Sequence, residues 1–254
     1  LMYKDQKTLT NSRIPVSSLE FPERKEKQAI YGMTSWGYKD YAFLELTARN
    51  EWSSTLPVNN NSYFYYSIGS SLVISDMFES LKGRTLGFWK LRGSFAQVGN
   101  DTGFDRLRTG YYRPENGSFL GLPYFVGEDV LKNGGLKPEK TQSWELGTEF
   151  RLWDNRIIAD FTYYNKRTTD QIVEADALLA SGYRREILNA GEIKNWGTEV
   201  SLSITPVKSN LVTWTSTFNW SKNNSRVVSL LDGVNRYEMG SGDNIKLYAE
   251  VGKP

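Results

Sequence analysis

The chain of 254 residues contains no cysteine and no histidine. Without thiols it can form no disulfide and no thiolate metal site. Without imidazole it can build neither a Ser-His nucleophile nor a histidine acid–base catalyst. The sequence also has no run approaching the roughly 18–20 apolar residues that a transmembrane helix needs. If this chain meets a lipid bilayer, it must therefore do so with β-strands.

Excess charge and catalytic motifs are absent as well. The 31 basic and 29 acidic residues leave a formal net charge of +2, and the two signs are mixed along the chain. Such a balance provides no field for binding nucleic acid. The sequence shows no nucleophile–base set, no metal-ligand cluster and no phosphate-binding glycine pattern. We therefore predict that the chain is not an enzyme, has no cofactor or metal, and does not bind nucleic acid.

Aromatic residues are abundant although total hydrophobic content is only 39%. There are 8 Trp, 15 Tyr and 12 Phe. Low apolar content with many aromatic residues suits a β-barrel in which every second residue faces water.

Eight stretches alternate apolar and polar residues, as expected for strands with one apolar and one polar face. In the clearest, Trp144, Leu146 and Phe150 alternate with Glu145 and Glu149. Strands of eleven to thirteen residues, tilted about 40°, rise roughly 28–33 Å, enough to cross an apolar band of about 25 Å. The predicted strands cover residues 27–37, 41–52, 62–75, 86–98, 140–153, 156–170, 194–206 and 211–222.

The connections between these strands alternate short and long. Asp154-Asn155 has side chains that tolerate positive φ and is predicted to form a two-residue turn. The long connections, residues 99–139 and 171–193, are expected to be extracellular loops, because periplasmic turns are short in outer-membrane barrels. We expect a short strand or hairpin near Leu107 to Tyr112 and one helical turn at Glu174 to Ala180. The pattern as a whole predicts an all-β, antiparallel, up-and-down transmembrane β-barrel segment.

All eight tryptophans fall within about four residues of a predicted strand end, as two aromatic belts at the membrane interfaces would require. Those beside the shorter connections are Trp36, Trp89, Trp153 and Trp214, and those beside the longer loops are Trp52, Trp144, Trp196 and Trp220.

Two further groups of side chains have predicted roles. On the polar face, Lys90, Arg92, Arg151 and Lys166 are expected to pair with Glu145 and Glu149. In the longest loop, five aromatic residues are candidates for contact with sugar rings or with a protein partner, since their rings have flat apolar faces. Alternatively they pack the loop against itself or against a companion protein. These residues are Tyr111, Tyr112, Phe119, Tyr124 and Phe125.

Three segments in the second half of the chain have distinctive sequences. Leu136–Gly147 reads LKPEKTQSWELG, Tyr163–Ile172 reads YYNKRTTDQI, and Asn189–Glu199 reads NAGEIKNWGTE. Each resembles a stretch typical of the SusC/RagA family of TonB-dependent outer-membrane transporters. Thr47–Pro57 and Lys90–Asn100 also resemble it, and the segments occur in the expected order.

The resemblance implies a 22-stranded barrel in the outer membrane of Bacteroidetes-type bacteria, with an N-terminal plug domain. It also implies import of oligosaccharides or peptides, energy from the TonB complex through a TonB box, and a SusD-like surface lipoprotein over the barrel mouth. The present chain has only eight or nine strands, no plug and no signal peptide at its start. We therefore expect residues 1–254 to be part of the barrel domain of a longer protein.

Two other interpretations remain open at this point. Eight strands could close into a complete small outer-membrane barrel with a structural or passive role. Alternatively, the strands could form a soluble glycan-binding β-sandwich with its tryptophans buried at mid-strand.

Overall fold

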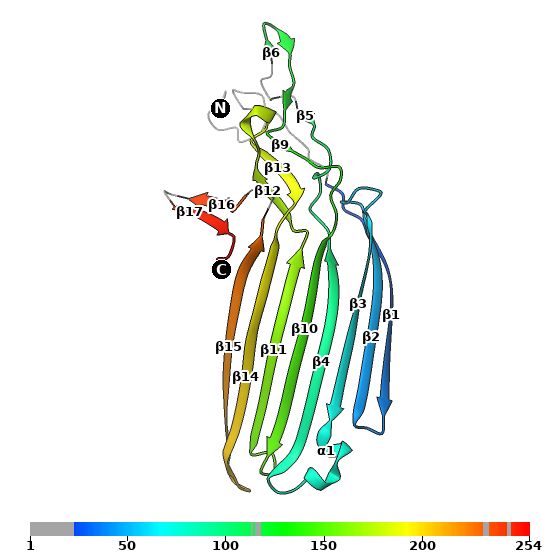
Figure 1. Cartoon of the computed structure of the whole chain (residues 1–254), viewed down its shortest axis with the longest axis vertical. Helices are drawn as coiled ribbons and strands as arrows, with labels where there is room; N and C mark the ends of the chain where they lie inside the picture. Colours follow the sequence, from blue (N-terminus) through cyan, green and yellow to red (C-terminus); the bar gives the residue numbers. More distant parts are fainter. Residues whose placement is uncertain (1–22, 113, 115–117, 231–233, 243–244) are drawn as a thin grey trace, which may run out of the picture.

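A computed structural model describes residues 23–112, 114, 118–230, 234–242 and 245–254. The predicted loop before residue 25 therefore lies mostly outside the described residues. The main feature is one eight-stranded sheet in which neighbours in sequence order pair antiparallel (Figure 1). Its strands are β1 (Lys27–Tyr38), β2 (Ala42–Ser53), β3 (Ser62–Val73), β4 (Leu86–Asn100), β10 (Glu139–Leu152), β11 (Ile157–Thr169), β14 (Glu192–Lys208) and β15 (Thr213–Ser229).

The sheet confirms the predicted up-and-down strand order. Its strands have 12 to 17 residues, whereas strands of globular proteins usually have about five or six. Within the described residues β1 and β15 are the two edges of the sheet and do not pair with each other. The sheet is therefore open, which argues against a self-contained small barrel. In the described part of the chain, the other sheets have only two or three strands, which argues against a β-sandwich.

Tight turns join the strands at one end of the sheet, which we call the turn end. Lys39 and Asp40 have φ of 48° and 58°, and Asp154 and Asn155 have φ of 54° and 63°. Two consecutive positive φ values are the signature of the type I′ turn, whose twist matches that of the flanking strands. The turn predicted at Asp154-Asn155 is thus confirmed. The connection between β3 and β4 contains α1 (Ile74–Met77) and the 3₁₀ turn η2 (Glu79–Leu81).

At the opposite end, which we call the loop end, long connections carry short strands. These are β5 (Tyr111–Tyr112), β6 (Ser118–Phe119), β7 (Leu122–Pro123), β8 (Val126–Gly127), β9 (Val130–Leu131), β12 (Ile172–Asp176), β13 (Arg185–Asn189), β16 (Arg236–Gly242) and β17 (Ile245–Glu250), with the 3₁₀ turn η3 (Leu179–Ser181). No helix among the described residues is long and apolar enough to cross a membrane.

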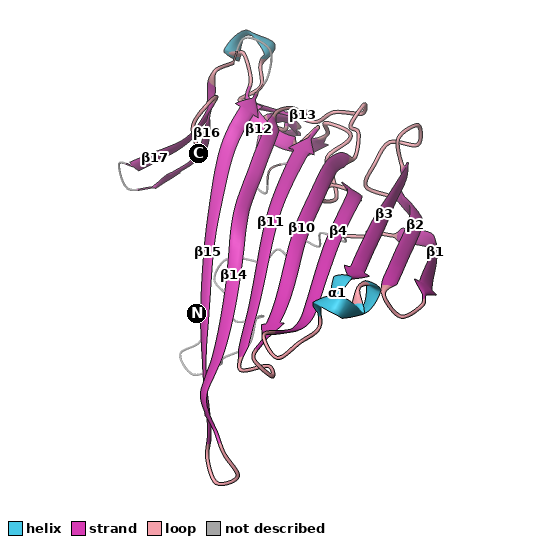
Figure 2. Cartoon of the chain, turned by 60° about the horizontal axis from the view of Figure 1, so that its bottom comes forward, coloured by secondary structure: helices cyan, strands magenta, loops and turns pink. Residues whose placement is uncertain are grey.

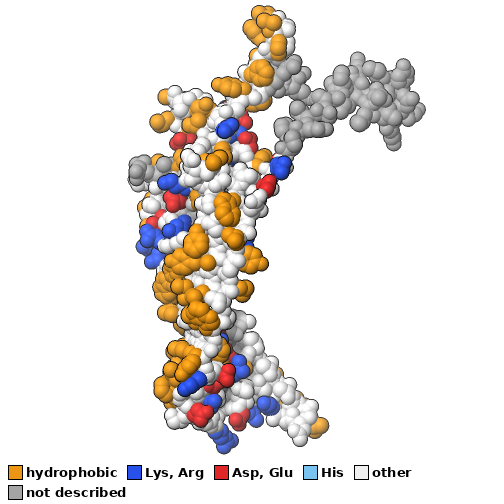
Figure 3. Space-filling view, turned by 90° about the vertical axis from the view of Figure 1, so that its right-hand side faces the viewer, with side chains coloured by type: hydrophobic (Ala, Val, Ile, Leu, Met, Phe, Trp, Pro, Cys, Tyr) orange, Lys and Arg blue, Asp and Glu red, His pale blue; other side chains and the backbone are white. Residues whose placement is uncertain are grey.

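Alternation places apolar and polar side chains on opposite faces of the sheet. Directly paired residues on neighbouring strands share a face, and the next row points the other way. One apolar row consists of Ala42, Leu72, Leu91, Thr148, Phe161, Val200 and Trp220. The adjacent row, on the polar face, consists of Phe43, Ser71, Arg92, Gly147, Thr162, Glu199 and Ser221. Figure 3 shows hydrophobic side chains gathered along the middle of the sheet and charged ones toward its ends.

The sheet is also staggered. The row that begins at Ala42, the first residue of β2, ends at Trp220, in the middle of β15. The hairpin of β14 and β15 accordingly reaches furthest at the turn end (Figure 2). Such stagger is the property that lets tilted strands close into a barrel, so the sheet has the geometry of a barrel wall.

The described hydrophobic core lies at the loop end rather than within the sheet. Leu56, Tyr63, Leu136 and Ile187 are each no more than 7% exposed and pack together. They come from three segments distant in sequence: Leu56 and Tyr63 around the start of β3, Leu136 before β10, and Ile187 in β13. The core therefore joins the loops into one body at the end of the sheet.

Two local predictions for the loops have different outcomes. The helical turn predicted at Glu174 to Ala180 is wrong in its first half, where β12 pairs with β13, and only η3 turns in a 3₁₀ manner. The short strand or hairpin predicted near Leu107 to Tyr112 is confirmed at Tyr111 and Tyr112, which form β5 and pair with β8. In both loops, strand pairing decides the local structure.

Candidate transport surface

On the polar face, Arg92 of β4 binds Asp160 of β11 across the intervening strand β10. Both guanidinium-to-carboxylate distances are 2.7 Å. The arginine lies over Gly147, where an added Cβ would come within 2.5 Å of Nε. Gly147 thus allows a bidentate ion pair between strands that are not neighbours.

The charged pairs of this face differ in part from prediction. Arg151 pairs with Glu149 at 2.8 Å, as expected, but Arg92 binds Asp160 rather than Glu145. Glu145 instead borders a depression of about 240 Å³ whose lining includes Glu45, Gly69 and Lys90. Glycine and serine residues in its floor leave the sheet surface hollowed, and the face presents both carboxylates and cations around this depression.

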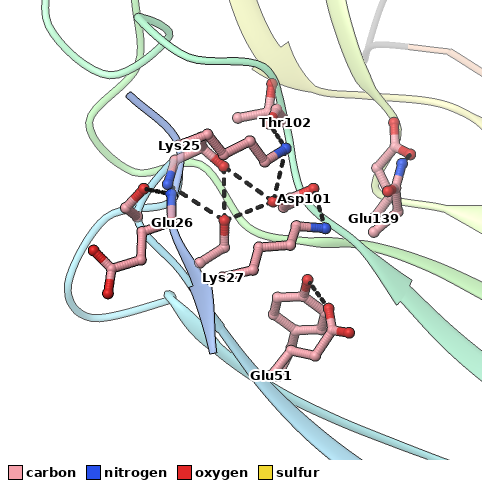
Figure 4. A network of polar contacts seen from close by, with 12 residues as sticks. Lys25, Glu26, Lys27, Glu51, Asp101, Thr102 and Glu139 are labelled. Atoms are coloured by element: carbon pink, nitrogen blue, oxygen red, sulfur yellow. Dashed lines mark hydrogen bonds and ion pairs between the residues drawn. The ribbon is translucent and has the colours of Figure 1, made fainter. Parts of the chain in front are cut away.

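Near the loop end, the buried carboxylate of Asp101 binds Lys25, Lys27 and Ser53, a cluster that we call the Asp101 node. The alternation of apolar and polar residues along the strands did not predict this cluster. Lys25 and Lys27 lie 3.0 and 2.9 Å from its carboxylate, and Ser53 donates to it at 2.6 Å. Figure 4 shows these side chains pointing toward one another. Burial alone would raise the pKa of Asp101, but Ser53 and the two ammonium groups outweigh it and hold the pKa below its usual range. The node joins the start of β1 to the end of β4.

Two further carboxylates bind partners near the loop end of the sheet. Tyr63 and Tyr65 of β3 donate to Glu51 of β2 at 2.6 and 2.9 Å, so that these contacts join two neighbouring strands. Glu139 accepts from the side chain of Asn100 at 3.0 Å and from the backbone of Ile172 at 2.9 Å. The second of these contacts attaches β12 to the sheet.

The five predicted contact aromatics all lie on one protruding hairpin, residues 111–127, which we call the finger (Figure 1). Its base is the pair β5–β8 and its outer part the pair β6–β7. All five are exposed, from 43% to 80%, and none belongs to the loop core. They are Tyr111, Tyr112, Phe119, Tyr124 and Phe125. Leu120, at 88% exposure, and Leu122, at 71%, belong to the tip of the finger, residues 118–125, whose sequence contains no charged residue.

Lys132 holds the two legs of the finger together at its base. Its side chain is only 8% exposed, and its Nζ lies 2.6 Å from Asp105 and 2.8 Å from Glu128. Lys132 lowers the pKa of Glu128, with help from the Gly110 backbone amide. Burial alone would lower the pKa of Lys132, but the two carboxylates raise it overall. The ion pairs thus favour the charged forms of both partners.

Four tryptophans lie at the turn end. Trp36 is opposite Leu44, Trp89 is opposite Phe150, and Trp214 is the second residue of β15. Trp153 lies in the turn after β10. Each of the four hairpins thus carries one tryptophan near its connection at the turn end.

The tryptophans assigned to the loop end are more dispersed. Trp52 is the penultimate residue of β2, and Trp144 and Trp196 share a row through Asn165. Trp220 lies at mid-strand, because β15 continues to Ser229 rather than ending near Lys222 as predicted. The prediction that Trp220 lies near a strand end was therefore wrong. That the tryptophans form two belts at the membrane interfaces stays a prediction.

Comparison with known proteins identifies the fold. The family model described as "TonB dependent receptor-like, beta-barrel" matches residues 2–245. A TonB-dependent receptor of Formosa agariphila is 28% identical over 229 residues, which cover 87% of this chain and 23% of that protein. The TonB-dependent receptor SusC of Bacteroides thetaiotaomicron is 27% identical over 124 residues, 48% of this chain and 12% of that protein.

A solved structure of the RagAB peptide transporter resembles the whole sheet and its loops. It superposes with a TM-score of 0.84 at 23% identity and covers 99% of this chain and 28% of that chain. The present chain thus spans about a quarter of the length of its first curated relative. It belongs to the TonB-dependent receptor-like β-barrel family and represents a fragment of that barrel.

Proposed function

We propose that this chain forms part of the wall of a TonB-dependent outer-membrane transporter, with its apolar face toward lipid and its polar face bordering the import path. The observation that carries the proposal is the separation of mainly apolar from mainly polar side chains across the seven strands from β2 to β15. Phe161 is 44% exposed, Phe218 61% and Trp220 56%. Apolar side chains of this size on one continuous face favour a hydrocarbon environment.

The absence of cysteine from the chain allows a direct test of this arrangement. Phe218 and Asn219 are adjacent in β15 but point to opposite faces. A spin label at Phe218→Cys should be accessible to oxygen dissolved in lipid, and one at Asn219→Cys to a water-soluble nickel complex. Equal nickel accessibility at both positions would contradict a membrane-spanning wall.

We further propose that the loop end faces the cell exterior. Three of the four connections at the turn end are tight turns, and short connections are typical of the periplasmic side of such barrels. In intact cells, a membrane-impermeant maleimide should label Leu120→Cys in the finger but not Leu211→Cys at the turn end. Both leucines are highly exposed, 88% and 95%, so that a difference in labelling would report sidedness rather than burial.

The transporter is proposed to import oligosaccharides or peptides, powered by the TonB complex and assisted by a SusD-like lipoprotein. The proposal draws support from the SusC relative and from the RagAB structure, whose name describes a peptide transporter. Uptake in cells carrying the intact transporter should stop when the proton gradient is dissipated. Uptake that continues at the same rate would exclude the energised mechanism.

The exposed finger is the proposed contact with the companion lipoprotein. Its tip combines apolar side chains with an absence of charge, as the centre of a protein interface does. Leu122→Asp should reduce co-purification of the lipoprotein. Leu211→Asp, at the opposite end of the sheet, should leave it unchanged.

A further inference from the structure

A second cavity lies at the loop end, separate from the depression near Arg92. It has a volume of about 280 Å³ and is bordered by β12, the outer parts of β14 and β15, β17 and Pro254. Its described lining includes Val173, Ala190, Ile193, Val227, Leu247 and Ala249.

Backbone hydrogen bonds hold the walls of this cavity in place. Ala190 donates to Gln171 at 2.7 Å. Val227 donates to Lys253 at 2.9 Å and accepts from Gly252 at 2.8 Å, which attaches the segment after β17 to β15. Ala190 and Val227 are only 8% and 5% exposed. The space is therefore preformed rather than a gap between loose loops.

The chemistry of the walls restricts what can enter. No charged side chain is among the described lining residues, and the polar ones are Gln171, Ser225 and Tyr248. A sugar ring would leave several hydroxyl groups without hydrogen-bond partners, which is costly. An apolar group gains about 25 cal/mol for each Å² removed from water, and apolar cavities of this kind accept apolar molecules readily.

The cavity opens on the polar side of the sheet. Ser225 and Val227 follow Ser221 at even spacing along β15, and they pair with Asn195 and Ile193. They therefore share the face of Arg92, which borders the proposed import path. A ligand in this cavity would lie at the outer entrance of that path.

We propose that this cavity is a subsite for one apolar side chain of a peptide-class substrate. The inference rests on the proposed transport function and specifies the substrate class. The volume accommodates a single branched aliphatic or aromatic side chain, while Gln171 and Tyr248 at the wall offer hydrogen bonds to the peptide backbone. The requirement is for one apolar group on an otherwise polar ligand, which oligosaccharides lack.

Calorimetry with the purified intact transporter tests this subsite. The probes are a blocked hexa-alanine peptide, the same peptide with one Leu or Phe, and maltohexaose. The Leu or Phe peptide should bind at least tenfold more tightly than hexa-alanine, and maltohexaose should bind no better than hexa-alanine. Equal affinity for the three peptides, or tighter binding of maltohexaose, would overturn the proposal.

Variants of the lining residues test whether this cavity causes the preference for the Leu or Phe peptide. Leu247, which is 61% exposed, can be changed to Asp with little risk to folding, and Leu247→Asp should abolish the preference for the Leu peptide. Val173→Phe should do the same by filling the space. Leu178→Asp, in an exposed loop outside the cavity, should retain the preference, and its loss there would also overturn the assignment.

Uptake measured in cells that carry the intact transporter distinguishes the proposed subsite from the proposed transport function. Gradient-dependent uptake without any preference among the peptides would leave the transport function intact and refute the subsite. A clear preference for the Leu or Phe peptide, together with uptake that continues without the proton gradient, would support the subsite and refute the TonB-powered transport.

Discussion

Arg92 and Asp160 are joined by two 2.7 Å hydrogen bonds although strand β10 lies between the two strands that carry them. The contact is possible only because Gly147, on the strand between them, has no side chain. The polar face is therefore stabilised across strands as well as along the backbone ladders. Four predictions follow from this and related contacts.

Gly147→Ala should weaken the barrel wall. The new Cβ would displace the Arg92 guanidinium and remove a charge-assisted hydrogen-bonded pair, at a cost of about 1–2 kcal/mol. Denaturant unfolding of the intact barrel in detergent would measure the loss. Gly69→Ala is the matched control, because its Cβ would meet only Glu45 at 3.9 Å. Equal destabilisation by both changes would show that Arg92 is not the cause.

Adjacent residues of β14 should respond in opposite ways to a new charge. Val200 is on the apolar face, opposite Phe161 and Trp220, and Ser201 is on the polar face, opposite Asp160 and Asn219. Val200→Lys should destabilise the barrel in a bilayer by roughly 2–4 kcal/mol if it lies near the midplane. Ser201→Lys should be nearly neutral. The difference is measurable as folding free energy in lipid vesicles, and a neutral Val200→Lys would argue against lipid contact there.

The Asp101 node should make the loop end sensitive to acid. The pKa of Asp101 is lower in the folded protein than its unfolded value of about 3.9. Its contribution is therefore present above about pH 4 and is lost as the pH falls through the depressed folded value. Hydrogen exchange near Ser53 and Thr102 should accelerate over that interval.

Asp101→Asn should remove this acid dependence and cost about 1–3 kcal/mol at neutral pH. Asp154→Asn, in an exposed turn that also tolerates Asn, is the control and should change neither quantity. If hydrogen exchange at the loop end is equally acid-sensitive in Asp101→Asn, another carboxylate is responsible.

Lys132→Met should loosen the finger without affecting the sheet. Methionine keeps the length of the side chain but breaks the contacts with Asp105 and Glu128. A loss of about 1.4 kcal/mol would raise the population of the open hairpin about tenfold. Limited chymotrypsin digestion should show faster cleavage near Tyr111 and Phe119. The exposed Lys208→Met at the turn end should digest like the unchanged protein, and unaltered cleavage in Lys132→Met would show that other contacts order the finger.

Prediction from sequence succeeded where the signal is local. Each of the eight long strands was placed to within a few residues at nearly every boundary, because a two-residue period is visible in any short window. The largest error was at β15, whose last residues, Asn223 to Ser229, are mostly polar and resemble a loop. They remain in the strand because β14 continues beside them and supplies hydrogen-bond partners as far as Glu192.

The candidate site was predicted less completely. Alternation assigned Arg92 to the polar face, but the choice of Asp160 over Glu145 depends on inter-strand register and on the space above Gly147. The finger aromatics were identified from their density in one long loop. The ion pairs of Lys132 with Asp105 and Glu128, and the Asp101 node, were not predicted. Nothing in their immediate sequence distinguishes these charged residues from solvated ones.

The amino-acid sequence by itself determined the number of long strands, the opposite character of their two faces and the positions of the tight turns. These properties depend on side-chain alternation and on residues such as Asp154 and Asn155 that accept positive φ, all within a few positions of one another. Only the tertiary structure decided that Leu56, Leu136 and Ile187 meet in one core and that Asp101 captures Lys25 and Lys27. Those contacts join residues far apart in the chain, and they arise only once register and stagger have brought the strand ends together.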